Sequence, residues 1–358
     1  MILEKKVRVL VVDDSAFMRK IISDLLKKDP ELDVVGTARD GEDALIKVEQ
    51  LRPDVVTLDV EMPKMDGLEF LRIQMSKVPL PVVMVSSLTQ EGAAVTLEAL
   101  DLGAVDFVPK PSGALSLDMH KVASDMCKKV KSAASARVRF VNRALSSSRL
   151  KIQSHYPKEF QTELKPESTN LEVAEKLVII GSSTGGPSAL MEVIPKLPKD
   201  LGAGVVVIQH MPPGFTKSLA DRLNKVSELT VKEAEDGDLI AKNRVLIAPG
   251  GYHLVAGKNR KVEINSDLPV HGVRPAVDVF MESAAPIYQD KTIGVILTGM
   301  GFDGAKGMKT IKRLGGRTVA QDEDSCVVYG MPRAVVDMGL ADRIASLNQI
   351  SDQIKELL

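Results

Sequence analysis

The sequence predicts two doubly wound α/β domains joined by a basic linker, and three observations carry this prediction. A length of 358 residues suits two or three domains at about 100 to 200 residues each. In both halves of the chain, short runs rich in Val, Leu and Ile alternate with longer segments of helical periodicity, as buried parallel strands and their crossover helices do. Between these halves, residues 127–170 hold ten Lys or Arg against three Glu, which indicates a partly helical, partly flexible linker.

Five apolar runs predict the strands of the first sheet, which is an open parallel sheet. They cover residues 7–12, 33–38, 55–59, 81–86 and 106–108. A last helix is expected to start near Asp118. We place this domain at residues 1–124 and the linker at residues 125–170.

Five further runs predict a second sheet within residues 171–358. They cover residues 176–180, 204–209, 244–249, 292–299 and 316–320. Residues 252–264 alternate around the turn signal "GKN", which predicts a small antiparallel hairpin.

The bulk composition argues against several classes of protein. The net charge is −1, from 47 basic and 48 acidic residues, so no overall field draws the molecule toward nucleic acid or an anionic membrane. Cys127 and Cys326 lie far apart without metal-ligand spacing, which fits a reducing compartment. The N-terminal pattern predicts no signal peptide, and the apolar runs are shorter than the ~18 residues that a membrane span needs. We therefore expect a soluble cytoplasmic protein.

Acidic residues follow two strands of the first domain. Asp13 and Asp14 end the first strand run and Asp59 ends the third, so their carboxylates should converge at one edge of the sheet. Such a cluster favours a bound Mg²⁺. Ser86 ends the fourth run, and Lys110 comes shortly after the fifth. Each acid alone could be a helix N-cap, but the five positions together suit accepting and holding a phosphoryl group.

This first segment resembles the receiver domain of bacterial response regulators. The stretches "VVDDS", "LDVEMPKMDG", "VSS" and "VPKP" match that family in order and spacing over about residues 5–124. The resemblance implies a flavodoxin-like fold and phosphorylation at Asp59. It also implies these further roles: Mg²⁺ ligands Asp13, Asp14 and Asp59, phosphoryl contacts Ser86 and Lys110, and the aromatic switch residue Phe107.

In the second domain, the stretch "GSSTG" matches the nucleophile-elbow pattern G-x-S-x-G. Gly181, Ser183 and Gly185 fill the pattern, which favours Ser183 over Ser182 as nucleophile and leaves Ser182 as a small spacer. Pro187 suits the first turn of a following helix. A serine- and glycine-rich turn at a helix start can equally bind a phosphate through its N–H groups, so the motif alone leaves both interpretations open.

Candidate partners for the serine come from the ends of other strands. His210 directly ends the second strand run and should project at the same sheet edge as Ser183. His253 is a lesser candidate, and His271 is expected in a loop. Asp303 follows the fourth run, where it could complete a triad or merely cap the next helix. The chain order Ser, His, Asp differs from that of the α/β-hydrolases, which argues against that fold.

The second domain resembles the catalytic domain of bacterial chemotaxis protein-glutamate methylesterases. The stretches "IGSSTGGPSAL", "VIQHMPPGFT", "IAPGGYH", "VRPAVDVF" and "LTGMGFDGAKGM" carry the resemblance. It implies a nucleophile at Ser183, a base at His210, an orienting carboxylate at Asp303 and no cofactor for the esterase. The implied oxyanion and pocket residues are Met300, through its backbone N–H, with Thr184 and Gly301. One departure is Val273, where many members have a histidine before the arginine, which argues against a role for this loop in polarising the substrate and leaves Arg274 as a candidate substrate contact.

Together the two resemblances imply a phosphorylation-activated enzyme of chemotactic adaptation. The expected substrates are glutamate methyl esters on the cytoplasmic helices of chemoreceptors, with deamidation of glutamine as a second activity. The expected phosphodonor is the chemotaxis histidine kinase, and the unphosphorylated receiver is expected to obstruct Ser183 until Asp59 is phosphorylated. The alternative is a phosphorylation-gated module that binds a nucleotide or phosphate at "GSSTGG" and has no esterase activity.

Overall fold

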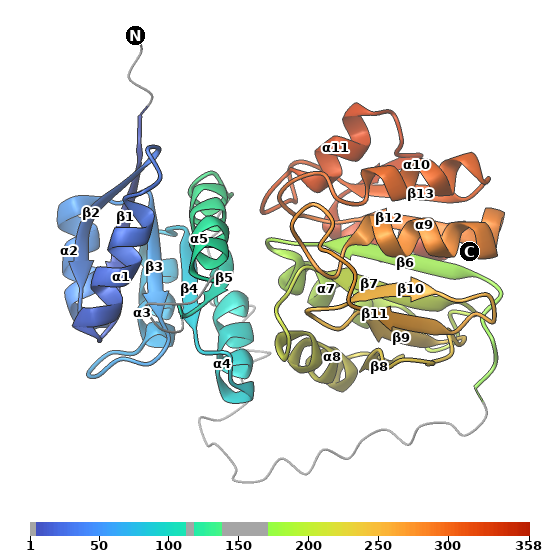
Figure 1. Ribbon diagram of the computed structural model, residues 1–358, viewed down its shortest axis with the longest axis horizontal. Helices are drawn as coiled ribbons and strands as arrows, with labels where there is room; N and C mark the ends of the chain where they lie inside the picture. Colours follow the sequence, from blue (N-terminus) through green and yellow to red (C-terminus); the bar gives the residue numbers. More distant parts are fainter. Residues whose placement is uncertain (1–4, 112–117, 138–170) are drawn as a thin grey trace. The chain divides into compact units, whose positions relative to one another are not determined.

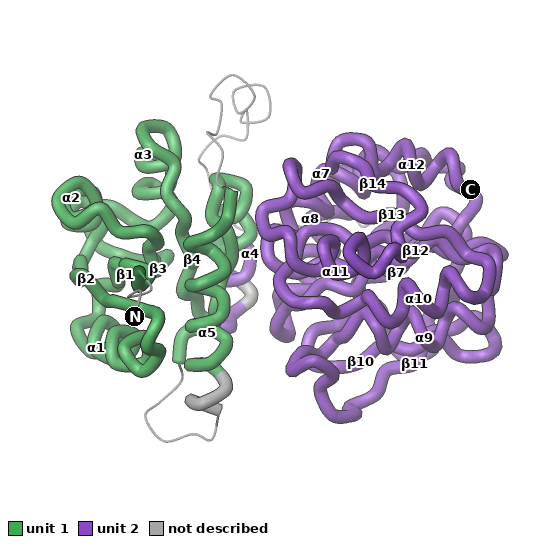
Figure 2. Tube along the Cα trace, turned by 90° about the horizontal axis from the view of Figure 1, so that it is seen from above, with its two compact units in different colours: residues 1–87, 95–167 green, residues 88–94, 168–358 purple. Residues whose placement is uncertain are grey.

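The computed structural model describes residues 5–111, 118–137 and 171–358. The chain forms two compact units, residues 1–87 with 95–167 and residues 88–94 with 168–358 (Figure 2). Most of the predicted linker, residues 138–170, lies outside the described residues. Among the helices that the structure describes, none is both long and apolar enough to cross a bilayer.

The first unit contains a five-stranded parallel sheet with the order β2-β1-β3-β4-β5 (Figure 1). Its strands are β1 Val7–Val12, β2 Leu32–Ala38, β3 Val55–Asp59, β4 Val82–Ser86 and β5 Asp106–Pro109. All residues of β3 and β4 are buried, as the unbroken apolar runs predict for central strands of a sheet covered on both faces. The predicted doubly wound fold of this domain is confirmed.

Helices alternate with these strands, and three of them begin at polar capping residues. They are α1 Ala16–Leu26, α2 Gly41–Leu51, α3 Gly67–Lys77, α4 Gln90–Asp101 and α5 Asp118–Ala134. Ser15, Asp40 and Asp66 accept hydrogen bonds from the first turns of α1, α2 and α3. The predicted domain boundary at residue 124 falls inside α5. This helix continues because Met126, Val130 and Ala133 are buried along one of its faces, a stripe that the neighbouring lysines obscure in the sequence.

The second unit contains a seven-stranded parallel sheet with the order β14-β13-β12-β6-β7-β9-β8. Its strands are β6 Leu177–Ser182, β7 Gly204–Gln209, β8 Thr230–Glu233, β9 Arg244–Ile247, β12 Thr292–Ile296, β13 Arg317–Gln321 and β14 Arg343–Ala345. The five predicted strands are present. Strands β8 and β14 were not predicted; they are short, partly exposed strands at the two edges of the sheet. From β6 the chain continues to β7 on one side, and the later strands β12, β13 and β14 lie on the other side. The carboxyl end of β6 is therefore at a topological switch point, where α/β sheets bind their ligands.

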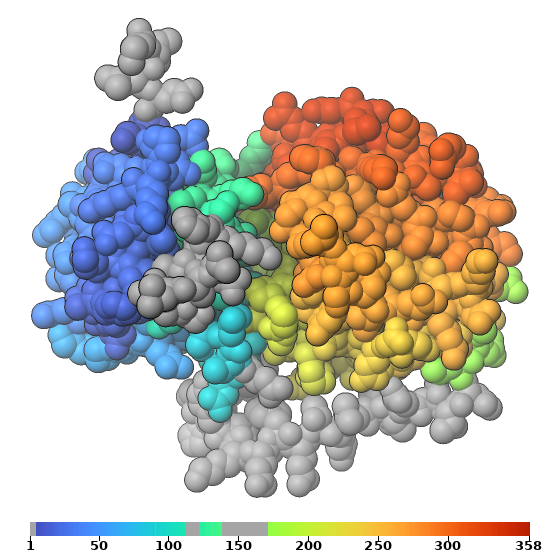
Figure 3. Space-filling model, viewed as in Figure 1, coloured from blue at the N-terminus to red at the C-terminus, as the bar shows by residue number. Residues whose placement is uncertain are grey.

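Helices cover both faces of this second sheet. They are α7 Gly186–Val193, α8 Phe215–Val226, α9 Val277–Tyr288, α10 Ala305–Arg313, α11 Met331–Asp337 and α12 Ile350–Leu357. The predicted hairpin is β10 His253–Ala256 paired antiparallel with β11 Val262–Asn265, and it packs on α9. In the space-filling view this hairpin lies on the surface of the unit (Figure 3). The main core lies between α9 and the sheet face formed by Leu177, Ile179 and Val206.

Candidate active site

Ser183 lies in the turn between β6 and α7, at the carboxyl edge of the second sheet. The strand ends at Ser182 and the helix begins at Gly186, so the nucleophile pattern occupies a sharp strand-to-helix turn. Gly185 has a φ of +76°, and a Cβ there would lie 2.7 Å from the side chain of Val327. Glycine adopts this positive φ without strain and has no Cβ to clash with Val327. Ser183, two residues earlier in the same turn, has a partly exposed side chain.

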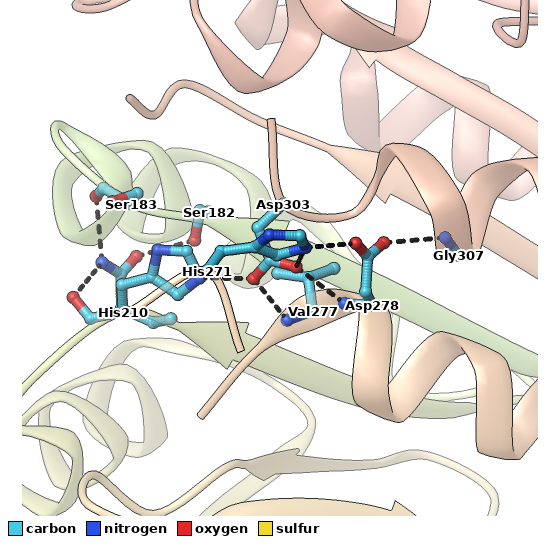
Figure 4. Close-up of polar contacts among 9 residues, drawn as sticks. Ser182, Ser183, His210, His271, Val277, Asp278, Asp303 and Gly307 are labelled. Carbon is cyan, nitrogen blue, oxygen red and sulfur yellow. Dashed lines mark hydrogen bonds and ion pairs between the residues drawn. The ribbon is translucent and has the colours of Figure 1, made fainter. Parts of the chain in front are cut away.

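The buried amide of Gln209 holds this turn against the end of β7. Ser182 Oγ donates to Gln209 Oε1 at 2.7 Å, and Gln209 Nε2 donates to Ser183 O at 2.9 Å and to His210 O at 3.2 Å (Figure 4). Ser182 is therefore an anchored hydrogen-bond donor rather than a mere spacer. Gln209 was not among the predicted site residues, although a glutamine at the end of a buried strand, next to a candidate histidine, is a usable signal.

His210 is placed next to Ser183 by the register of the sheet. Ser182 pairs with Gln209 across β6 and β7, so Ser183 and His210 are the next residues at the same edge of neighbouring strands. His210 Nε2 lies 2.8 Å from Asp303 Oδ2, and in Figure 4 the imidazole ring lies between Ser183 and Asp303. With Nε2 donating to the carboxylate, neutral His210 has its lone pair on Nδ1 and can accept a proton there.

Asp303 accepts hydrogen bonds on both carboxylate oxygens. Oδ2 accepts from Val277 N at 2.7 Å and Oδ1 from Asp278 N at 2.9 Å, which places the carboxylate at the N-terminus of α9. Burial alone would raise the pKa of Asp303, but the His210 hydrogen bond and charge and the two backbone N–H groups lower it, and the net direction is downward. Asp303 thus remains an anion against His210, and the helix that it caps is α9 rather than the following helix.

The loop after β12 brings Met300 close to the serine turn. A Cβ at Gly299 would lie 2.8 Å from Ser183 Cβ, so the backbone directly before Met300 approaches Ser183. Within the part of the chain that the structure describes, the Met300 N–H donates no backbone hydrogen bond. Thr184 is buried and its carbonyl accepts from Thr298 Oγ1 at 3.0 Å, while Gly301 is exposed with a φ of +86°. The oxyanion role of Met300 stays a prediction that this geometry favours.

The first unit brings its three acids together as expected. Oxygen atoms of Asp13, Asp14 and Asp59 lie within 4.8 Å of one another, and Lys110 Nζ lies 2.7 Å from Asp59 Oδ2 and 3.7 Å from Asp13 Oδ2. Within the described residues, the buried Asp13 Oδ2 has no hydrogen-bond donor. Burial raises the pKa of Asp59 to about 6, against the lowering effect of Lys110. An electron-rich, under-satisfied oxygen cluster of this kind fits a hard divalent cation such as Mg²⁺.

Comparison with known proteins assigns both halves of the chain. Residues 178–354 match the CheB methylesterase family and residues 9–120 match the response regulator receiver domain. A protein-glutamate methylesterase/protein-glutamine glutaminase of Symbiobacterium thermophilum is 53% identical over 98% of this chain and 97% of its own length. This chain belongs to the same family. The Thermotoga maritima relative is 48% identical over 99% of both chains. The crystal structure of the Thermotoga maritima CheB methylesterase catalytic domain matches 51% of this chain and 98% of that domain, with 52% identity and a TM-score of 0.50.

Of the remaining candidates in this methylesterase, His253, Arg274 and His271, the described residues show a side-chain contact with Asp303 only for His271. His253 is buried in β10, where its Nε2 donates to Leu268 O at 3.1 Å. Arg274 donates to the carbonyls of Ser266 and Asp267 at 2.8 and 3.0 Å, a structural contact within its own loop. In contrast, the Nε2 atom of His271, which the sequence places in a loop, lies 3.9 Å from Asp303 Oδ1.

In the receiver half, Ser86 lies at the end of β4 and Phe107 lies within β5. Val85 pairs with Asp59 in the sheet, and the next residue, Ser86, accepts a hydrogen bond from Thr96 Oγ1 at 2.7 Å. Phe107 is buried, with Lys129 Nζ 5.2 Å from its ring centroid and donating to its carbonyl at 2.8 Å. The phosphoryl contact and the switch role stay predictions.

Proposed function

We propose that the chain hydrolyses glutamate methyl esters and deamidates glutamine with Ser183 as nucleophile, His210 as general base and Asp303 as the orienting carboxylate. The His210–Asp303 hydrogen bond of 2.8 Å, next in register to Ser183, is the observation that carries this assignment. A phosphate-binding turn would need neither a base at this position nor a buried anion behind it. The binding-module alternative is not supported by the family matches.

The geometry supports a two-step acyl transfer. Ser183 Oγ attacks the ester carbonyl while its proton passes to His210 Nδ1, and the Asp303 carboxylate stabilises the imidazolium. The carbonyl oxygen becomes an oxyanion that accepts from the Met300 N–H. Its collapse expels methanol, or ammonia from glutamine, with the proton returned by His210. Water, deprotonated by His210, then attacks the acyl-enzyme to release glutamate and free Ser183.

In the receiver, Asp59 is the proposed phosphoryl acceptor, with Asp13 and Asp14 as the further residues that would hold Mg²⁺. The cation, when bound, neutralises charge on the phosphoryl oxygens. Lys110 adds a positive charge beside Asp59 Oδ2, and Ser86 offers a hydroxyl at the end of the adjacent strand. We propose chemoreceptor cytoplasmic helices as substrate, a chemotaxis histidine kinase as phosphodonor, and a cytoplasmic location.

Methanol release from methylated receptor, measured with and without a small-molecule phosphodonor and Mg²⁺, tests this function. We expect hydrolysis that rises with the phosphodonor, and no such rise in Asp59→Asn. A fluorophosphonate probe should label Ser183 in the same preparation. Absence of both methanol release and labelling would support a binding module instead.

Mg²⁺ binding gives a separate test of the acidic cluster. Asp13→Asn should weaken Mg²⁺ binding at least about tenfold in titration calorimetry, because it replaces a buried anionic ligand by a neutral amide. Since the pKa of Asp59 is raised to about 6, Mg²⁺ must displace a proton in acid, so the affinity should fall from pH 7 to pH 5. Asp24→Asn, on the exposed face of α1, is the matched control and should change neither value. Unaltered binding in Asp13→Asn would remove Asp13 from the ligand set.

A further inference from the structure

A tight turn holds His271 beside the catalytic pair. Val270 and Val273 exchange backbone hydrogen bonds of 3.2 and 3.0 Å, and the two residues between them, His271 and Gly272, have φ values of +54° and +78°. Two successive positive φ values are those of a type I′ turn. A non-glycine residue is uncommon in this conformation, so placing His271 at this turn position costs conformational free energy.

The His271 ring contacts Asp278 and the loop that carries Asp303. Its Nε2 donates to Asp278 Oδ2 at 2.9 Å (Figure 4). The ring also packs edge-on against Phe302, with centroids 4.7 Å apart and planes at 71°. Phe302 directly precedes Asp303 in the chain. His271 therefore contacts Phe302, which precedes Asp303 in the chain, and Asp278, whose backbone N–H donates to Asp303.

Asp278 joins this second histidine to the catalytic one. Its backbone N–H donates to Asp303 Oδ1 at 2.9 Å, and its own Oδ1 accepts from Gly307 N at 2.7 Å. It thus lies at the N-terminus of α9, caps α10, and fixes the two helix ends that surround Asp303. The result is a continuous chain of contacts from His271 through Asp278 and Asp303 to His210.

We propose that His271 is a positioning residue for the ester hydrolysis, acting through Asp278 to keep the Asp303 carboxylate in its place against His210. This inference rests on the proposed roles of Ser183, His210 and Asp303. His271 need not touch the substrate. Its effect is expected on the rate of the chemical step and not on substrate binding.

The burial of Asp278 and its nearness to Asp303 explain why the hydrogen bond from His271 matters for the position of both carboxylates. Burial raises the pKa of Asp278, the Gly307 N–H and His271 lower it, and the charge of Asp303 raises it, with a net upward direction. A buried carboxylate that loses a donor beside a second carboxylate must take up a proton or move toward water. Either response changes the charge or the geometry at Asp303, and small misplacements of catalytic groups cost large factors in rate.

Two substitutions at the same position separate this role from a merely structural one. Asparagine readily adopts the left-handed conformation of the turn, but its shorter amide does not reach Asp278. Glutamine places an N–H donor at about the reach of the imidazole Nε2. We expect His271→Asn to lower kcat for methanol release about tenfold with KM changed less than about twofold. His271→Gln should stay within about threefold of the unmodified enzyme.

The measurements are kcat, KM and the fluorophosphonate labelling rate of Ser183 in the full chain, at a temperature where thermal melts show each variant folded. Wild-type kcat in His271→Asn, an equal loss in His271→Gln, or a loss confined to KM would each overturn the positioning role. Absence of labelling in the unmodified protein would instead overturn the proposed nucleophile, so the two failures are distinguishable.

Discussion

Ser183→Ala is expected to reduce methanol release by at least about 10⁴-fold and to leave the fold intact. The substitution removes the hydroxyl of the turn residue that lies next in register to His210. The neighbouring Ser182 hydroxyl cannot replace it, because it is buried and donates to Gln209 Oε1. Because the Ser183 side chain is partly exposed, the free energy of unfolding should change by less than about 0.5 kcal/mol. Single-turnover assays with methylated receptor and a thermal melt measure both quantities.

Ser182→Ala is the matched control, with the opposite expected outcome. It leaves the buried Gln209 Oε1 without its donor, which should cost about 1 to 3 kcal/mol of stability. Hydrolysis should persist at more than about a tenth of the unmodified rate, since Ser183, His210 and Asp303 remain. An inactive Ser182→Ala beside an active Ser183→Ala would exchange the roles of the two serines.

The sequence could predict the residues at strand ends because each follows a recognisable buried run. Ser183, His210 and Asp59 each lie at the end of an apolar strand, and parallel strands bring such ends to one edge. The strands that escaped prediction, β8 and β14, have only four and three residues and lie at sheet edges, where the apolar pattern is short and incomplete.

The contacts that hold the catalytic residues could not be predicted in the same way, because they join segments distant in the chain. Asp303 caps α9, which begins 26 residues before it, whereas local sequence offered only the helix that follows. Gln209 reaches back to Ser183 through the pairing of β6 and β7. His271 lay in an unremarkable loop, and only the fold brings it within 3.9 Å of Asp303. Local patterns thus located the proposed reacting groups, and tertiary structure supplied the contacts that orient them.

Asp59→Asn is expected to stabilise the unphosphorylated protein near neutral pH while it removes the proposed phosphoryl acceptor. Burial raises the pKa of Asp59 to about 6 from an unfolded value of 3.8, so folding favours the protonated carboxyl. The destabilisation by the charged form therefore develops as pH rises from about 4 to 6 and is fully present above 6. At 1.36 kcal/mol for each unit, the difference of about two units corresponds to about 3 kcal/mol, a figure that already includes the lowering effect of the Lys110 contact.

We therefore expect Asp59→Asn to raise the free energy of unfolding by about 1 to 3 kcal/mol at pH 7.5, and by much less at pH 4. Urea unfolding of the full chain at both pH values, without Mg²⁺, measures the difference. Mg²⁺ should narrow the gap at pH 7.5, because the cation stabilises the charged Asp59 but gains less from a neutral amide. Equal stability of the two proteins at pH 7.5 without Mg²⁺ would show that Lys110 alone compensates the buried charge. The charged Asp59 carboxylate would then not destabilise the folded protein, and neither phosphorylation nor Mg²⁺ binding could gain free energy by neutralising it.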